Sequence, residues 1–310
     1  MIYTVNGPIE KDQMGITLSH EHFKWETDSS YAYKLYFDRD YDYEKTNKVF
    51  ELLLPVLEDL YANSCRTIVE TSPPIGGQNI MLLKKLSQKS GINIIPCTGW
   101  NLPKYTHQIH SNNFAKELAF KWIKDFQEGL DTIDGINIKP GYIKLLLERG
   151  ELTTVDQEML RAAVIASKET GMPIHCHILE AEILYSVIDL LEKENFDLFK
   201  FLWAHACKEG DFDAINYGYN KGIWIGFDMI REGNYKNKFK LISKTIKQGF
   251  EDKVLLSQDY DFYEQAVELN NPQSCVSFFT KFIPYCHNNG LPENIIEKMI
   301  TENPANFYDF

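Results

Sequence analysis

The sequence lacks any apolar run that approaches the roughly 20 residues needed to span a bilayer, so we expect no membrane segment. Its first twenty residues have neither a basic start nor a continuous apolar stretch, which argues against a secretory signal. Cysteine is scarce, since six residues in 310 are too few for a disulfide scaffold and most of them lie inside apolar runs. We therefore predict reduced, buried thiols and a cytoplasmic protein.

Basic clusters are lacking as well. The formal net charge is −12, and no basic run is interleaved with aromatic residues. A negative surface repels phosphate backbones, so we expect no nucleic acid partner. The chain also has no internal repeat, low-complexity tract or flexible linker. We therefore expect residues 1–310 to form a single domain, a size that α/β barrels reach.

Short apolar, β-branched runs recur along the chain, and most are separated by segments long enough for a helix. This alternation predicts parallel strands joined by right-handed crossovers. Eight runs have this character: 15–20, 66–70, 92–97, 142–146, 173–177, 201–205, 223–227 and 253–257. A closed barrel and an open, doubly wound sheet both fit such a pattern.

The connecting segments carry helical signals. Apolar residues follow helical spacing from Met159 to Ala166, behind a capping box formed by Thr154 and Gln157. The same spacing recurs around residues 49–60, where Pro55 is expected to kink or split the helix.

Two connections are longer than the others. Residues 23–44 are rich in aromatic side chains and follow His22 directly, so they could form a lid over the barrel mouth. A packed loop or a subunit contact within a homodimer explains the same aromatics equally well. The other connection, residues 101–138, is expected to contain an extra helix near 112–127.

The strongest local signal for chemistry is the segment His20-Glu21-His22, which follows the first apolar run. Side chains two apart on an extended segment point to the same face, so both imidazoles can bind one metal ion while Glu21 points the other way.

Metal-type residues also stand at other strand ends. His177 and His205 each end a run, and Asp259 follows the last run, where one oxygen can bind a metal and the other can accept a proton. His175 shares a face with His177 and is expected one layer deeper in the barrel. Parallel strands of a barrel gather these ends at one face. We therefore predict a (β/α)8 TIM barrel with a metal site at the carboxyl ends of its strands.

Lys144 lies within an apolar run, where an ammonium would pay a large desolvation penalty. A neutral amine that reacts with carbon dioxide would become an anionic carbamate able to bridge two cations. Snorkelling or pairing with a carboxylate would also satisfy the lysine. The surrounding histidines favour the carbamate.

Three further residues are expected to contact substrate at the rim: Trp100, Asp228 and Arg231. A salt bridge within the loop is the alternative for the last two.

Taken together, these segments resemble the phosphotriesterase family of the amidohydrolase superfamily, in particular its lactonase-like bacterial members. The matching segments cover nearly the whole chain and include Gly15–His22, Arg66–Glu70, Gly141–Lys144, Gly171–His177, Ala204–His205, Ile225–Asp228, Leu255–Asp259 and Asn303–Ala305.

The resemblance implies two divalent metals, usually zinc, in a (β/α)8 barrel. It assigns His20, His22 and Asp259 to one metal and His177 and His205 to the other. Carboxylated Lys144 and a hydroxide would bridge both ions, and Asp259 would accept the proton released on attack.

The expected function is hydrolysis of a small-molecule ester, most directly a lactone. A phosphorylated sugar lactone would need basic and tyrosyl groups at the rim, for which Lys208, Tyr235 and Lys236 are candidates, whereas Asp261 would repel phosphate. A main activity as a phosphotriesterase or aryl esterase is the first alternative. A non-catalytic, metal-stabilised binding protein is the second, and it predicts that Asp259→Asn leaves biological activity intact.

Overall fold

The computed structural model describes residues 1–73, 76–100, 113–147, 149–206 and 212–310. Within these residues, parallel strands form a closed ring in which most paired strands keep a regular register, and one pair shifts register between Leu18 and Glu21. The ring runs β3 (Thr17–Glu21), β4 (Thr67–Glu70), β5 (Asn93–Ile95) with β6 (Cys97–Trp100), β9 (Tyr142–Leu146), β10 (Ile174–His177), β11 (Phe201–Ala204), β12 (Trp224–Phe227) and β13 (Val254–Leu256).

Two details make this ring an eight-stranded barrel. Only Pro96 separates β5 from β6, so these two strands occupy one position, as a single strand interrupted where proline offers no amide donor. Past the end of β13, the Asp259 amide donates to the His20 carbonyl (3.1 Å) and the His22 amide donates to the Tyr260 carbonyl (2.8 Å), which closes the ring between β13 and β3. The predicted barrel and its strand positions are confirmed.

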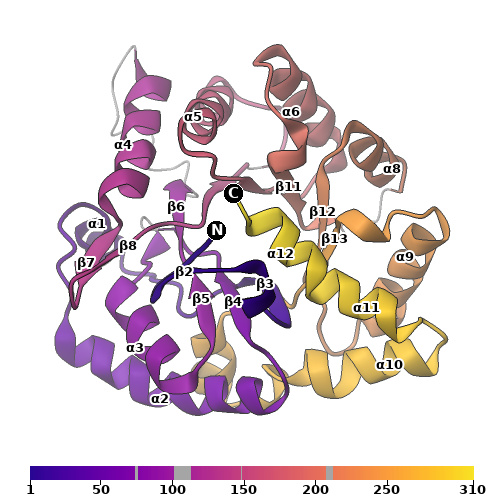
Figure 1. The fold of residues 1–310 in the computed structure, drawn as a ribbon, viewed down its shortest axis with the longest axis horizontal. Coiled ribbons are helices and arrows are strands. Elements are labelled where there is room, and N and C mark those ends of the chain that lie inside the picture. The colour runs from indigo at the N-terminus through magenta and orange to yellow at the C-terminus, as the bar shows by residue number, and fades with distance from the viewer. Residues whose placement is uncertain (74–75, 101–112, 148, 207–211) are drawn as a thin grey trace.

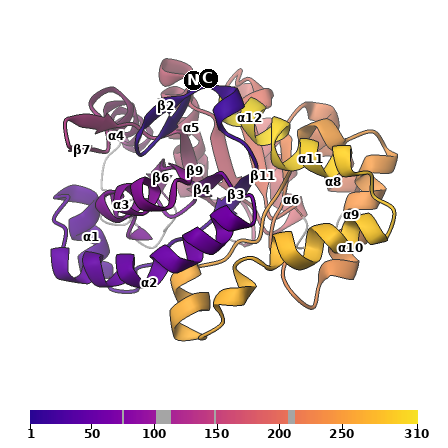
Figure 2. The same ribbon diagram turned by 60° about the horizontal axis from the view of Figure 1, so that its bottom comes forward.

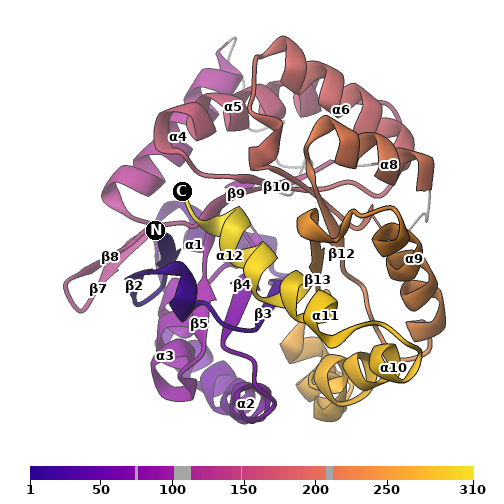
Figure 3. The same ribbon diagram turned by 45° about the vertical axis from the view of Figure 1, so that its right-hand side comes forward.

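Helices surround the strands, as Figure 1 shows. The structure assigns α2 (Tyr43–Ala62), α3 (Ile80–Ser90), α4 (Phe114–Glu128), α5 (Thr154–Thr170), α6 (Ala181–Lys193), α8 (Phe212–Lys221), α9 (Tyr235–Lys247), α10 (Ile283–Asn288) and α11 (Glu293–Ile300). The last helix, α12 (Glu302–Tyr308), crosses one end of the barrel (Figure 3).

The core has two parts. The larger part lies between the strands and the surrounding helices. The smaller part fills the barrel and includes Tyr142, Trp224 and Leu255 from the strands with Phe307 and Tyr308 from α12. Helix α12 covers this end of the barrel, and polar side chains gather at the opposite, carboxyl end. The chain termini meet beside α12, where the Met1 ammonium pairs with the Asp309 carboxylate (Figure 2).

Two helix predictions need correction. The capping box of α5 is formed by Thr153 and Asp156, one residue before the predicted pair, because Thr153 has the extended backbone that an N-cap requires. Helix α2 continues through Pro55, so of the two predicted outcomes, a kink or a split, the split does not occur. Proline removes only the bond to the Glu51 carbonyl on the exposed face, and buried residues on the other face hold both halves of the helix.

The sequence reading missed two hairpins, β1 (Ile2–Thr4) with β2 (Gly7–Ile9) and β7 (Asp131–Ile133) with β8 (Ile136–Ile138). The second turns at Asp134-Gly135, where both residues have positive φ, as in the two-residue turns that favour this dipeptide.

The aromatic segment 23–44 packs on the barrel and contains a helix, α1 (Ser29–Phe37), capped by Asp28. Its Phe23, Leu35 and Tyr41 are buried, as the packed-loop interpretation expects. The predicted extra helix near 112–127 corresponds to α4, and its residue 112 lies outside the described residues.

Five cysteines are free and buried, as predicted: Cys65, Cys97, Cys176, Cys275 and Cys286. The sixth, Cys207, lies outside the described residues. No helix among the described ranges is both long enough and apolar enough to cross a membrane.

Candidate metal centre

Nitrogen and oxygen ligands from distant strands converge at the carboxyl end of the barrel. Lys144 pairs in register with Gly99 on one side and His175 on the other. Gly99 has φ +128°, and a β-carbon there would lie 2.0 Å from the Lys144 carbonyl oxygen. Only glycine at position 99 therefore lets β6 approach Lys144 this closely.

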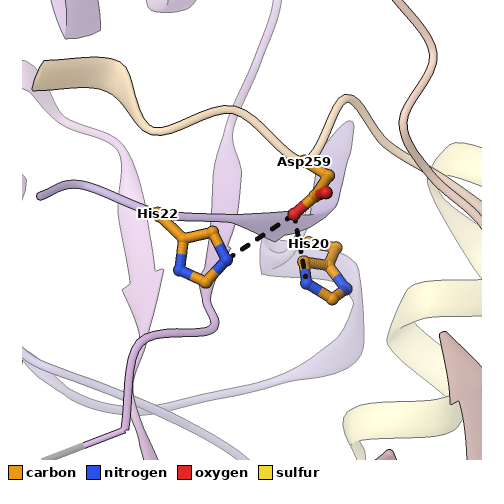
Figure 4. A group of neighbouring side chains, drawn as sticks. All are labelled: His20, His22 and Asp259. Carbon is orange, nitrogen blue, oxygen red and sulfur yellow. Dashed lines mark ion pairs between the residues drawn. The ribbon is translucent and has the colours of Figure 1, made fainter. Parts of the chain in front are cut away.

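The first group of ligands consists of His20, His22 and Asp259 (Figure 4). The Asp259 Oδ1 lies 3.5 Å from the His20 Nε2 and 3.6 Å from the His22 Nε2. The His22 Nδ1 contacts the Ser72 hydroxyl at 2.7 Å, which leaves Nε2 facing the carboxylate. These three residues form the triad that the resemblance assigns to one metal.

A second group consists of His20, His205 and Asp228. The Asp228 Oδ1 lies 2.6 Å from the His205 Nδ1, while Oδ2 accepts the His205 backbone amide at 2.9 Å. The sequence placed Asp228 at the rim, but the structure buries its carboxylate against the histidines. A carboxylate on one imidazole nitrogen orients the ring so that the other nitrogen faces a metal. Asp228 therefore supports His205.

His205 and Asp259 share an unusual backbone conformation. Their φ angles are +66° and +55°, in the left-handed region that non-glycine residues seldom adopt. Both residues follow the ends of strands, β11 and β13. Such strain gathers at functional sites, where the surrounding structure holds it in place. At both positions such a turn carries a side chain of the candidate centre.

Lys144 is buried within this group, with 2% of its surface exposed. Its Nζ lies 3.3 Å from the His20 Nε2. Burial lowers the pKa of Lys144, although Asp259 and Asp228 oppose this effect. The lysine predicted to bridge two metals thus faces the first ligand triad.

The two histidines of β10 lie at different depths. His177 is half-buried, and its ring centroid lies 4.2 Å from that of His205. His175 is 1% exposed and contacts the His20 Nδ1 through its Nε2 at 3.0 Å. His177 thus joins the centre through His205, and His175 lies behind His20.

Burial and neighbouring positive charge control the protonation of the histidines. Burial, reinforced by Lys144, holds the pKa of His20 and of His175 well below the ordinary value. Burial also lowers the pKa of His177 to about 2, with further lowering from His205. These imidazoles are therefore neutral at physiological pH, which is the form that binds metals.

Asp259 and His22 shift each other's pKa in opposite directions. Burial works to raise the pKa of Asp259, but the hydrogen bond from His22 and the charges of His205 and Arg231 lower it to about 2. Burial works to lower the pKa of His22, and Asp259 raises it overall. Asp259 is therefore an ionised acceptor in the centre.

The residues predicted to contact substrate are placed differently. The Arg231 Nε donates to the Gln258 carbonyl at 3.2 Å, and its guanidinium also donates to the Asp259 carbonyl. Arg231 thus holds the turn that carries Asp259. Trp100 ends β6, and its side chain lies outside the described part of the structure.

The other rim candidates have structural partners or lie elsewhere. The Tyr235 hydroxyl donates to the Ser277 carbonyl at 3.4 Å, and its ring packs on Phe282. Lys236 is exposed on α9, and Lys208 lies outside the described residues. The Asp261 carboxylate accepts the amides of Trp25 (2.6 Å) and Glu264 (2.9 Å).

Three buried residues near the centre were not predicted as part of it. Glu70, at the end of β4, accepts the amides of Phe23 and Ser72. The rule that polar residues ending strands gather at one face could have identified it. Glu21 accepts three hydrogen bonds from the turn after β13. Tyr308 contacts His175 from α12, and no local signal marks it.

The donor set fits divalent metal ions. Neutral imidazoles and an ionised carboxylate are the ligands that zinc and related ions prefer. Each of the two groups has ligand atoms within 4.8 Å of one another. His20, His22, Asp259 and His205 would hold the ions, with Lys144 beside them.

Comparison with known proteins agrees with this centre. The phosphotriesterase family model matches residues 1–308. The chain is 23% identical to a phosphotriesterase homology protein of Escherichia coli, covering 96% of this chain and 99% of that protein. It is 29% identical to an aryldialkylphosphatase of Saccharolobus solfataricus, covering 97% and 96% of the two chains. It is 22% identical to an N-acetyltaurine hydrolase of Xenopus tropicalis, covering 100% and 98%. The chain belongs to the phosphotriesterase family of metal-dependent hydrolases.

Proposed function

We propose that this chain is a binuclear hydrolase, loaded with zinc, that opens a neutral lactone. The observation that carries the proposal is the convergence of His20, His22 and Asp259 with His205 and Lys144 at one end of the barrel. Bound divalent cations would lower the pKa of water to about 7 and polarise the carbonyl oxygen of an ester.

Asp259 would accept the proton that the attacking water releases. Its Oδ1 faces the Nε2 atoms of His20 and His22, so Oδ2 is the oxygen that would take the proton. The Arg231 guanidinium lies 3.5 Å from Oδ2 and favours its ionised form. Passing this proton to the leaving oxygen would complete general acid–base catalysis.

The state of the rim supports a neutral substrate. Arg231 uses its Nε and one of its two NH2 groups on the Gln258 and Asp259 carbonyls, so only part of its guanidinium is left for a phosphate group. Asp261 uses its carboxylate to hold Trp25 and Glu264 beside the mouth. We therefore favour an unphosphorylated lactone over a phosphorylated sugar lactone.

Two relatives direct the choice of competing substrates. The aryldialkylphosphatase favours a phosphotriester as the second candidate, and the N-acetyltaurine hydrolase makes an acylated amino sulfonate a necessary comparison. The test compares kcat/KM of the zinc-loaded protein for neutral lactones, phosphorylated lactones, an aryl ester, a dialkyl aryl phosphate and N-acetyltaurine. We expect the highest value for a neutral lactone. No turnover of any lactone would refute the lactonase proposal, and a higher value for the phosphotriester would replace it.

We also propose that Lys144 is carboxylated. Because burial lowers its pKa, more of the amine is neutral and able to attack carbon dioxide. A new bond forms between Nζ and the carbon, one proton leaves, and the product carries a carboxylate. The intact mass of the native protein should exceed the sequence mass by one carbon dioxide and lose it on acidification. Lys144→Met, which keeps the side-chain length without the amine, should lack this increment and bind metal more weakly. An unmodified native mass at full metal content would refute the carbamate.

A further inference from the structure

His175 has no role in the proposed reaction, although it lies behind a metal ligand. It is 1% exposed and stands between His20 and Tyr308. Its Nε2 lies 3.0 Å from the His20 Nδ1, and its Nδ1 lies 3.0 Å from the Tyr308 hydroxyl. A continuous row of hydrogen bonds thus connects α12, which crosses the end of the barrel in Figures 1 and 3, to the metal centre.

At the Tyr308 end of this row, the Ser19 carbonyl fixes the direction of the hydrogen bonds. The Tyr308 hydroxyl lies 3.3 Å from the Ser19 carbonyl oxygen, which can only accept. The phenol therefore donates its one proton to Ser19 and accepts from the His175 Nδ1–H. The His175 Nε2 is then left with a lone pair, which accepts from the His20 Nδ1–H.

At the His20 end of the row, Asp228 favours the same direction. The Asp228 Oδ2, which is an acceptor when ionised, lies 3.5 Å from the His20 Nδ1. A proton on this nitrogen therefore has two acceptors, His175 and Asp228. The other nitrogen of His20, Nε2, faces the Lys144 Nζ at 3.3 Å and the Asp259 Oδ1 at 3.5 Å. The reverse direction would place a proton on Nε2, where a metal needs a lone pair.

We propose that Tyr308 and His175 are positioning residues that hold His20 as its Nδ1–H tautomer, with the Nε2 lone pair directed at the metal. Metal-binding histidines usually donate their second nitrogen to a carboxylate or carbonyl, and this partner fixes their tautomer and orientation. Here the main partner is a neutral imidazole, held in turn by a tyrosine of the last helix. The inference rests on the proposed function for the presence of the metal, but the tautomer itself does not.

The first measurement is the tautomer of His20. Nitrogen-15 spectra of the full-length protein, with its histidines labelled, distinguish the protonated from the unprotonated ring nitrogen, both with zinc and after chelation. The wild-type protein should show a proton on Nδ1 in both states. His175→Leu should weaken this preference in the chelated protein, because Asp228 is then the remaining acceptor for the Nδ1 proton. A proton on Nε2 of the chelated wild-type protein would overturn the inference.

The second measurement is zinc affinity by competition with a chelator. His175→Leu should lower the affinity about 10- to 100-fold, the usual effect of losing a partner behind a metal ligand. His175→Gln should largely restore it, since the amide oxygen can accept from His20 and the amide nitrogen can donate to Tyr308. Tyr308→Phe should have a smaller effect, because His175 keeps its contact with His20.

Tyr142→Phe is the matched control. Tyr142 is buried in the same core cluster as Tyr308. Its hydroxyl donates to the Glu70 carbonyl at 2.7 Å and so takes no part in the row of hydrogen bonds from Tyr308 to His20. This variant should keep the wild-type tautomer and zinc affinity at a similar cost in melting temperature. Equal zinc affinity in His175→Leu and the wild-type protein would overturn the inference. A wild-type protein that shows the Nδ1–H tautomer without binding zinc would support the positioning role and refute the metal site of the proposed function.

Discussion

Asp228→Asn should weaken the metal centre without changing its ligands. Asp228 uses both oxygens on His205: Oδ1 contacts the ring Nδ1 at 2.6 Å, and Oδ2 accepts the backbone amide at 2.9 Å. Asparagine can accept only one of these two bonds. If its oxygen stays on the ring, its NH2 group faces the His205 amide, and two donors are buried against each other. The left-handed turn at His205, with φ +66°, then loses its anchor.

The size of the effect follows from these two contacts. A lost hydrogen bond to a charged group costs about 1.5–3 kcal/mol, and a buried unsatisfied donor costs about 1–3 kcal/mol. We expect a loss of about 3 kcal/mol in the metal-free protein. An unfolding entropy of about 2 cal/mol/K per residue converts this loss into a fall of about 5 °C in melting temperature. Zinc affinity should fall about 10- to 100-fold because the loosened turn no longer holds His205 in place.

Calorimetry of the chelated protein and competition with a chelator measure the two effects. Asp261→Asn is the matched control, because Asp261 also accepts two backbone amides, and within the described residues no hydrogen bond joins its carboxylate to a histidine side chain. It should lower the melting temperature while leaving zinc affinity unchanged. The reasoning fails if Asp228→Asn binds zinc as tightly as the wild-type protein, or if both variants lose the same affinity.

Two other variants test the centre. Asp259→Asn should lower kcat about 10²- to 10⁴-fold, the usual contribution of a positioned base, in steady-state assays of protein whose metal content is matched to the wild type; an unchanged kcat would remove Asp259 from catalysis. Burial raises the pKa of Glu70 from 4.5 to about 7. Because the folded value lies above the unfolded one, the stability from the protonated form is complete below about pH 4.5 and is lost as the pH rises through about 7. Urea titrations of chelated protein should therefore show that Glu70→Gln removes about 3 kcal/mol of pH dependence between about pH 4 and pH 8. Identical pH dependence in the two proteins would contradict this account.

The barrel and the convergence of most candidate ligands at one end could be predicted because each strand carries a complete local signal. An apolar run that ends in His20, His177 or His205 predicts a strand and places the histidine at its carboxyl end. Parallel pairing then brings these carboxyl ends together at one face of the barrel. The same rule would have found Glu70. It failed for Asp228, because the direction of that side chain depends on the turn at His205 rather than on strand alternation.

Side-chain contacts between segments far apart in the chain could not be predicted from the sequence. Tyr308 and His175 are 133 residues apart, and neither has a neighbour in the chain that announces the contact. Helix α12 is held at one end of the barrel by its packing against interior residues from many strands, and no local sequence signal predicts that packing. The hairpin at Asp134-Gly135 is a different case, since its turn signal is local and could have been predicted.

The closure of the barrel and the assembly of the first metal triad depend on the same three residues. In His20-Glu21-His22, strand alternation sends both imidazoles toward Asp259 and sends Glu21 to the seam with β13. There the fully buried Glu21 accepts from the Ser257 hydroxyl at 2.7 Å and from the amides of Gln258 and Tyr260 at 2.8 and 2.9 Å. These donors flank Asp259, so one segment supplies two ligands and fixes the turn that carries the third. The His-Glu-His pattern therefore joins the first and last strands through Glu21, and the same pairing brings His20 and His22 to Asp259.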